Sequence, residues 1–70
     1  MIFIFITNIM NEWQRTQVAP ALNQLLGADN WNVDLTDCDK VLRVEADNDV
    51  SASIIRTLYL HGFSCANMVY

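Results

Sequence analysis

The pattern of apolar and polar positions along the chain predicts six secondary-structure elements. Strict alternation of apolar and polar residues is typical of a half-buried strand, and apolar residues spaced three or four apart are typical of a helix. The predicted elements are, in order, a strand at 2–8, a helix at 12–26, strands at 31–36 and 40–46, a helix at 52–61 and a strand at 63–70.

The first predicted strand is apolar on both of its faces. Phe3 and Phe5 point to one side, and Ile2, Ile4 and Ile6 point to the other, because successive side chains of a strand alternate. A strand of this kind lies either within a sheet that is covered on both faces or in a sheet with helices on one face and a second subunit on the other.

The first predicted helix is amphipathic and contains a proline. Gly27 is the residue expected to end it, and Pro20 should bend it near Thr16, because proline removes one backbone donor. The apolar stripe of this helix consists of Val18, Ala21, Leu22 and Leu25.

The two middle strands alternate, so each has one buried and one exposed side. The sequence "DCD" between them predicts a turn, and Ser51 is the expected N-cap of the second helix. The residues expected to face inward are Trp31, Val33, Leu35, Leu42 and Val44, and on the second helix Ile54, Ile55 and Leu58. The residues expected to face outward are Asn32, Asp34, Arg43 and Glu45.

The order strand, helix, strand, strand, helix, strand predicts an α+β fold of the ferredoxin-like type in a single domain, residues 1–70. Its four-stranded antiparallel sheet carries both helices on one face, with the first strand central. The uncovered face would then display Ile2, Ile4 and Ile6 together, which favours a homodimer through this face. Small monomeric domains also expose scattered isoleucines, so the alternative is a monomer.

Composition and charge exclude several classes of partner. The net charge is −4, and the four basic residues form no cluster, so neither nucleic acid nor an anionic membrane surface is an expected partner. The basic residues are Arg15, Lys40, Arg43 and Arg56. Two cysteines are too few for a disulfide framework, and no apolar run is long enough to span a membrane. We therefore expect a cytoplasmic protein whose protein partner, if it has one other than itself, is unknown.

Local sequence blocks give a resemblance that covers almost the whole chain. The blocks "FITNI", "VAPALNQLLG", "NWNVDL", "KVLRVE" and "HGF" resemble, in order and spacing, those of the heavy-metal-associated domains, a family of small copper-chaperone-like domains. The resemblance implies a C-x-x-C metal site in the first loop. Here its two cysteine positions hold Asn11 and Gln14, and the position two before the first of them holds Ile9.

The loss of both cysteines removes the expected metal chemistry. Copper(I) and zinc(II) bind tightly to thiolate or imidazole donors, and neutral amides are weak ligands. Asn11 and Gln14 have the spacing of a capping box, in which Asn11 caps the helix and the Gln14 side chain reaches back to the backbone N–H of the cap. We therefore expect a structural helix start, with no cofactor.

Four other residues could in principle be metal ligands but also have ordinary structural roles. Met10, Cys38, His61 and Cys65 are expected near the same end of the domain and form the alternative, a soft-metal site with a non-standard ligand set. No two of them have the sequence spacing of metal ligands. We therefore expect Met10 to be a loop residue, Cys38 a turn residue, His61 a helix-end residue and Cys65 a core residue.

The chain has no residue pattern expected of an enzyme. It holds one histidine, no arrangement of serine, histidine and acid, and no glycine-rich phosphate loop. Acylphosphatase-like chemistry would need an anion cradle, of which Arg15 is the single hint. Trp13 is expected on the exposed first turn of the helix, as a contact residue or packed against Phe63. The sequence thus predicts a non-catalytic interaction or structural module.

Overall fold

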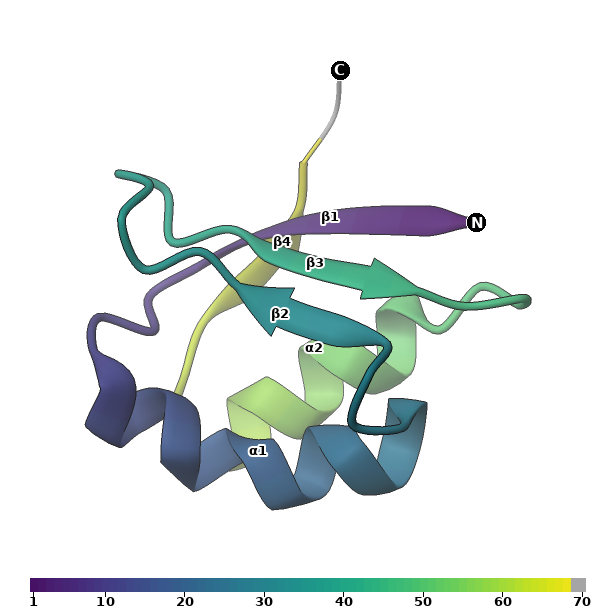
Figure 1. Cartoon of the computed structure of the whole chain (residues 1–70), viewed down its shortest axis with the longest axis horizontal. Helices are drawn as coiled ribbons and strands as arrows, with labels where there is room; N and C mark the ends of the chain where they lie inside the picture. The colour runs from purple at the N-terminus through teal and green to yellow at the C-terminus, as the bar shows by residue number, and fades with distance from the viewer. Residues whose placement is uncertain (69–70) are drawn as a thin grey trace.

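The computed structural model describes residues 1–68 and contains four strands and two helices in an α+β arrangement (Figure 1). The elements are β1 (Ile2–Thr7), α1 (Glu12–Leu26), β2 (Trp31–Val33), β3 (Leu42–Glu45), α2 (Ser51–Leu60) and β4 (Cys65–Asn67). The predicted order of elements is confirmed. Residues 69 and 70 of the last predicted strand lie outside the described residues.

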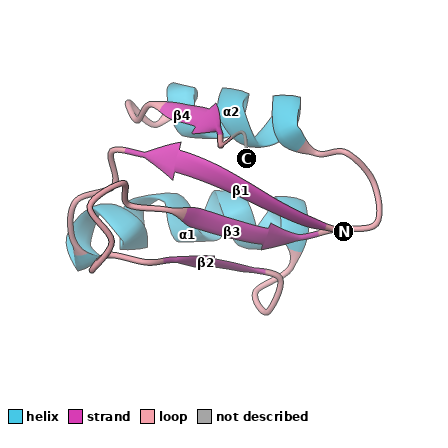
Figure 2. Cartoon of the chain, turned by 90° about the horizontal axis from the view of Figure 1, so that it is seen from above, coloured by secondary structure: helices cyan, strands magenta, loops and turns pink. Residues whose placement is uncertain are grey.

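The four strands form one antiparallel sheet in the order β2-β3-β1-β4. As predicted, β1 is central and β2 and β4 are the edges. Both helices lie on the same side of the sheet, so the molecule has two layers (Figure 1). Seen from above, the strands lie in front of the helices with no described segment covering them (Figure 2).

The core lies between the sheet and the helices. Its fully buried side chains come from every layer: Phe5, Ile9, Val18, Leu22, Leu42, Val44, Ile54 and Leu58. The predicted alternation in β2 and β3 is confirmed, because Trp31, Val33, Leu42 and Val44 are buried while Asn32, Arg43 and Glu45 are exposed. Burial of these apolar side chains supplies most of the stabilising free energy.

The two middle strands are shorter than predicted, for a local reason. The Asp34 carboxylate accepts hydrogen bonds from both the backbone N–H (3.0 Å) and the hydroxyl (2.7 Å) of Thr36, which turns the chain away from β2. The Thr36 hydroxyl, and then its N–H, hold the pKa of the Asp34 carboxyl below its ordinary value. Short polar side chains bond their own backbone two residues on, and this competes with a strand ladder.

The helices differ from the predictions at Ser51 and at Leu25. Ser51 is not an N-cap. It is the first residue of α2, and its N–H donates to Asp49 Oδ1 at 2.9 Å, which lowers the pKa of the Asp49 carboxyl. Leu25 is 39% exposed and does not belong to the buried stripe of α1. Helix α1 continues through Pro20, and the bend near Thr16 stays a prediction.

Candidate functional site

The start of α1 is built by the two residues that stand at the cysteine positions of the resemblance. Asn11 is the N-cap, with extended backbone (φ −155°, ψ 174°), and its Oδ1 accepts the backbone N–H of Gln14 at 2.9 Å. Gln14 Oε1 in turn accepts the backbone N–H of Met10 at 2.7 Å. The predicted capping box is confirmed in kind, with one correction. Gln14 bonds the N–H of Met10, one residue before the cap, and not that of Asn11.

The rest of the first loop is held by hydrogen bonds to two distant segments. The buried Thr7 hydroxyl donates to the Lys40 carbonyl (2.5 Å) and accepts from the N–H of Ile9 (3.3 Å). Asn8 Oδ1 accepts the N–H of Ser64 at 2.8 Å. Ile9 itself is fully buried in the core. The loop is therefore fixed to the β2–β3 turn and to the segment before β4 by its own side chains.

This loop offers no tight ligand for a soft metal ion at its two amide positions. The Asn11 and Gln14 side-chain oxygens are already hydrogen-bond acceptors for backbone N–H groups. Neutral amide oxygens are hard, weak donors to copper(I) or zinc(II). The arrangement can begin and stabilise a helix, and that is the chemistry it supports.

The four residues of the alternative ligand set lie in different surroundings. Cys38 is exposed on the turn before β3, whereas Cys65 belongs to edge strand β4 and packs against the core. The central strand β1 separates them, because Thr7 pairs with Cys65 and its N–H donates to the Asp39 carbonyl. Burial raises the pKa of the Cys65 thiol to about 11. His61 caps the end of α2, with Nδ1 2.8 Å from the Thr57 carbonyl oxygen, in line with its predicted helix-end role.

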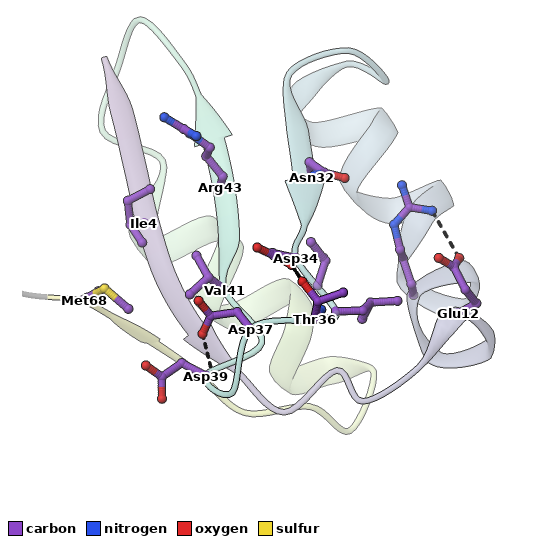
Figure 3. A pocket seen from close by; sticks show the side chains of 13 residues that line it. Ile4, Glu12, Asn32, Asp34, Thr36, Asp37, Asp39, Val41, Arg43 and Met68 are labelled. Atoms are coloured by element: carbon purple, nitrogen blue, oxygen red, sulfur yellow. Dashed lines mark hydrogen bonds and ion pairs between the residues drawn. The ribbon is translucent and has the colours of Figure 1, made fainter.

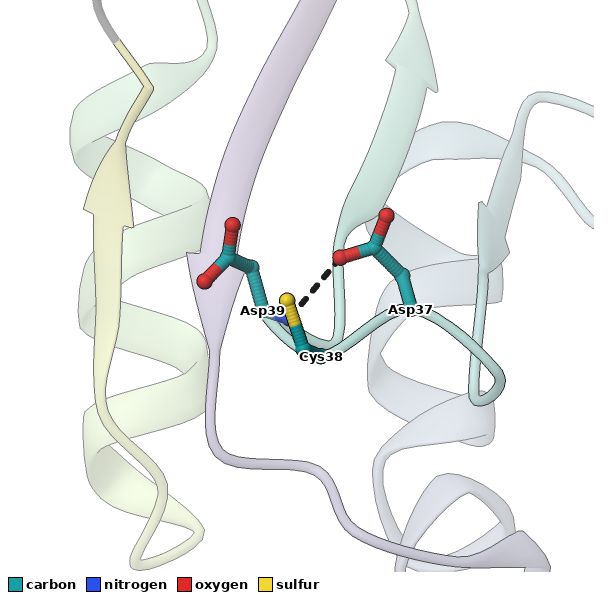
Figure 4. A group of neighbouring side chains, drawn as sticks. All are labelled: Asp37, Cys38 and Asp39. Carbon is teal, nitrogen blue, oxygen red and sulfur yellow. Dashed lines mark hydrogen bonds between the residues drawn. The ribbon is translucent and has the colours of Figure 1, made fainter.

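A small acidic turn surrounds Cys38. Among residues 1–68, Asp37, Cys38 and Asp39 are the one group of three histidine, cysteine or acidic side chains whose ligand atoms lie within 4.8 Å of one another (Figure 4). Asp37 Oδ1 accepts the N–H of Asp39 at 2.8 Å, which is a turn-forming bond. The predicted turn is confirmed, and this hydrogen bond accounts for the carboxylate of Asp37.

The uncovered face of the sheet displays a stripe of isoleucines along its central strand. Ile2 is 51% exposed, Ile6 is 39% exposed, and Ile4 between them is half-buried, whereas Phe5 on the opposite face is fully buried. The predicted separation of the two faces of β1 is confirmed. Water is therefore in contact with β-branched side chains in the middle of a sheet.

Both neighbouring strands add side chains to this open face. Ile6 lies opposite Ala66 of β4, and the N–H of Met68, which follows β4, donates to the Ile4 carbonyl at 2.9 Å, so this edge adds two more apolar residues. On the other side Ile2 lies opposite Glu45 and Ile4 opposite Arg43. The open face therefore has an apolar half over β1 and β4 and a charged half over β3.

A wide, shallow hollow of about 960 Å³ runs from this face around edge strand β2 toward α1 (Figure 3). Ile4, Arg43 and Met68 lie at one side of it, and Glu12 of α1 lies at the other. Its wall is mainly polar and includes three aspartates, at positions 34, 37 and 39. An open acidic hollow of this form is a surface feature and not an enclosed ligand cavity.

Trp13 does not join the isoleucines. It is 70% exposed on the first turn of α1, in the helix layer, as predicted, and its packing against Phe63 stays a prediction. The second tryptophan is structural. Trp31 is 9% exposed, its Nε1–H donates to Asn23 Oδ1 at 2.7 Å, and the Arg15 guanidinium lies 5.3 Å from its ring centroid.

Sequence reasoning missed two features. The Asn23–Trp31 bond joins α1 to β2, and Asn23 had no local signal beyond its exposed position on the helix. The grouping of Arg43 and Glu45 beside the isoleucines could have been found, because both were expected to face outward on the strand that neighbours the first.

Comparison of the chain with protein-family models, with curated proteins and with solved structures finds no match. Neither helix in the described part of the chain has the length and apolar character needed to cross a membrane.

Proposed function

We propose that this chain is a non-catalytic interaction module with a ferredoxin-like fold, and that it associates with a second copy of itself through the open sheet face. The observation that carries this proposal is the exposed isoleucine stripe on the central strand. Contiguous apolar surface in the middle of an uncovered sheet is typical of an interface.

The size of the domain supports a second copy as the occupant. A stable interface takes roughly 800 Å² from each partner. The chain measures 28 × 28 × 20 Å, so an interface of this area occupies most of one side of it. The open face is the side that combines apolar residues with no covering segment. A domain this small also gains stability when part of its surface is buried against a partner.

We propose further that the chain is a degenerate member of the heavy-metal-associated domain family, which it resembles in sequence. The support for this proposal is the pair Asn11 and Gln14, whose side chains form a helix cap at the two ligand positions. We infer that the loop has a structural role and that the chain works without a resident metal. The two free cysteines agree with a reducing, cytoplasmic location.

The test of self-association is the mass of the folded protein in solution. We expect a dimer of the wild-type chain in sedimentation equilibrium, and a monomer for Ile4→Lys, which places a charge in the centre of the stripe. Ser53→Lys, on the exposed surface of α2, is the matched control and should remain dimeric. A wild-type chain that is monomeric at every concentration would contradict the proposal.

The metal-free part of the proposal is tested by native mass spectrometry of the reduced protein with copper(I) and zinc(II). No adduct should survive a competing chelator. A stoichiometric adduct that does survive would favour a soft-metal domain with a non-standard ligand set, and Met10, Cys38, His61 and Cys65 would be the residues to replace.

A further inference from the structure

The charged half of the open face contains one positive and one negative side chain on the same strand. Arg43 and Glu45 are both exposed and are separated by one inward-facing residue, Val44. Within residues 1–68 the single ion pair is Arg15 with Glu12 (3.6 Å), so neither charge of β3 is paired inside the protomer. Both lie directly beside the isoleucine stripe, opposite Ile4 and Ile2.

This arrangement is self-complementary under two-fold symmetry. In a symmetric dimer every contact occurs twice. If one residue contacts a second residue of the partner, the second residue of the first copy contacts the first residue of the partner. Two opposite charges on one strand therefore form two equivalent ion pairs when a two-fold axis passes between them. The axis must lie across the strands, at the level of Val44 and Phe3, which pair with each other in the sheet.

We propose that two copies pack open face to open face about such an axis, so that Arg43 of each pairs with the partner's Glu45. This inference rests on the proposed function and adds the register of the dimer. The isoleucine stripes then run antiparallel, with Ile2 of one copy over the partner's Ile4. The apolar half of each face lies over the apolar half of the other.

The alternative axis, parallel to the strands, is opposed by the cost of burying charge. It would place β3 of one copy over β4 of the other, so that Arg43, which is level with Ile4, would face Met68. An ionised side chain that leaves water without a partner is strongly unfavourable, whereas an opposite charge offsets part of that cost. The charge pattern therefore favours the axis across the strands over the axis along them.

The test exchanges charges between copies. In a homodimer of Arg43→Glu, positions 43 and 45 are negative in both copies. In a homodimer of Glu45→Arg, the same positions are positive in both copies. Each single variant should therefore weaken the dimer by about ten- to a hundredfold, since like charges brought together at an interface cost up to several kcal/mol. An equimolar mixture of the two variants should form a heterodimer of near wild-type affinity, because every contact across the axis is then between opposite charges.

The double variant Arg43→Glu/Glu45→Arg should form a homodimer again, since it exchanges the two charges within each copy. The mixture is read by native mass spectrometry, with one variant labelled with ¹⁵N so that its mass differs. Formation of the heterodimer also shows that both single variants are folded.

The outcomes separate this inference from the function on which it rests. A wild-type dimer together with single variants that dimerise as tightly would overturn the register and leave self-association intact. Single variants that dimerise weakly and form no heterodimer when mixed would overturn the register as well, since residues 43 and 45 would then not face each other across the interface. A monomeric wild-type chain would instead remove the proposed function itself.

Discussion

The side chain of Asn11 accepts the backbone N–H of Gln14 at the first turn of α1, and the side chain of Gln14 accepts the backbone N–H of Met10, the residue before Asn11. The first bond satisfies one of the backbone donors that a helix start leaves without an intrahelical partner, and the second ties the preceding loop to the helix. The bond lengths of 2.9 and 2.7 Å are those of well-formed hydrogen bonds. The two positions that the resemblance assigns to metal ligands thus contribute to folding.

Asn11→Ala should lower the free energy of unfolding by about 1 kcal/mol, because it removes the N-cap acceptor. For a domain of this size, that loss corresponds to a fall in Tm of about 4–8 °C. Thermal unfolding followed by circular dichroism measures it. Asn11→Asp is the control and should unfold near the wild-type temperature, since aspartate is an equally good cap. An unchanged Tm for Asn11→Ala would show that the cap does not stabilise the helix.

Restoring the two thiols should create a metal site if the resemblance is correct. We expect the variant Asn11→Cys/Gln14→Cys to bind one copper(I) or zinc(II) ion that the wild-type chain does not retain. Thiolates at a helix N-terminus are favoured by the helix dipole and are the donors that these ions prefer.

The matched control for this metal site is Asn11→Ser/Gln14→Ser, which keeps polar cap residues and adds no thiol. Competition with a chromophoric chelator measures the affinity of each variant. If the double-cysteine variant binds no more tightly than this control, the loop does not have the geometry of the family and the resemblance loses its main support.

The bond between Trp31 and Asn23 should contribute measurably to stability. Asn23→Ala leaves the indole N–H of Trp31 without its acceptor in a partly buried position, and we expect a loss of about 1 kcal/mol or more. Urea unfolding followed by the fluorescence of Trp31, in a Trp13→Phe background, reports this change. The neighbouring exposed Gln24 supplies the control variant Gln24→Ala, which should unfold like the background protein.

The two cysteines should differ in reactivity. Burial raises the pKa of the Cys65 thiol from its ordinary value of 9.0 to about 11, whereas Cys38 is exposed on a turn. Since the thiolate is the nucleophile, iodoacetamide at mildly alkaline pH should label Cys38 first and Cys65 slowly. Equal labelling rates in the folded protein, measured by mass spectrometry, would contradict this assignment.

The raised pKa of Cys65 also has a consequence for stability. The unfolded chain loses this proton at lower pH than the folded chain, so the folded state holds more protons between about pH 9 and about pH 11. The contribution of the neutral thiol is therefore complete below pH 9 and is lost as the pH rises to 11. Cys65→Ala should remove this part of the alkaline loss of stability, as seen in urea unfolding at several pH values.

Much of the architecture follows from local pattern. The alternation in Trp31–Val33 and in Leu42–Glu45 predicts which side chains are buried, because the two faces of a strand must meet different surroundings. The doubly apolar first strand likewise predicts a central position and an uncovered isoleucine stripe. The helix start at Asn11 could be recognised because capping depends on residues three apart.

Other details were decided by neighbours distant in sequence. Leu25 matches the apolar stripe of α1 but is 39% exposed, whereas its neighbour Leu26 packs against the core. Asn23 is an ordinary helix residue until the sheet brings Trp31 within hydrogen-bond distance. Local pattern does not contain such contacts, because the chain must fold before the groups meet.

The sequence by itself determined the order of elements, the buried face of each strand and the residues that begin α1, since each depends on groups within a few positions of one another. Only the tertiary structure decided the register of the sheet, which places Arg43 opposite Ile4, Glu45 opposite Ile2 and Cys65 opposite Thr7, with no ion-pair partner for either charge among residues 1–68. Those relations arise from the pairing of β1 with β3 and β4, which joins residues about 40 to 60 positions apart.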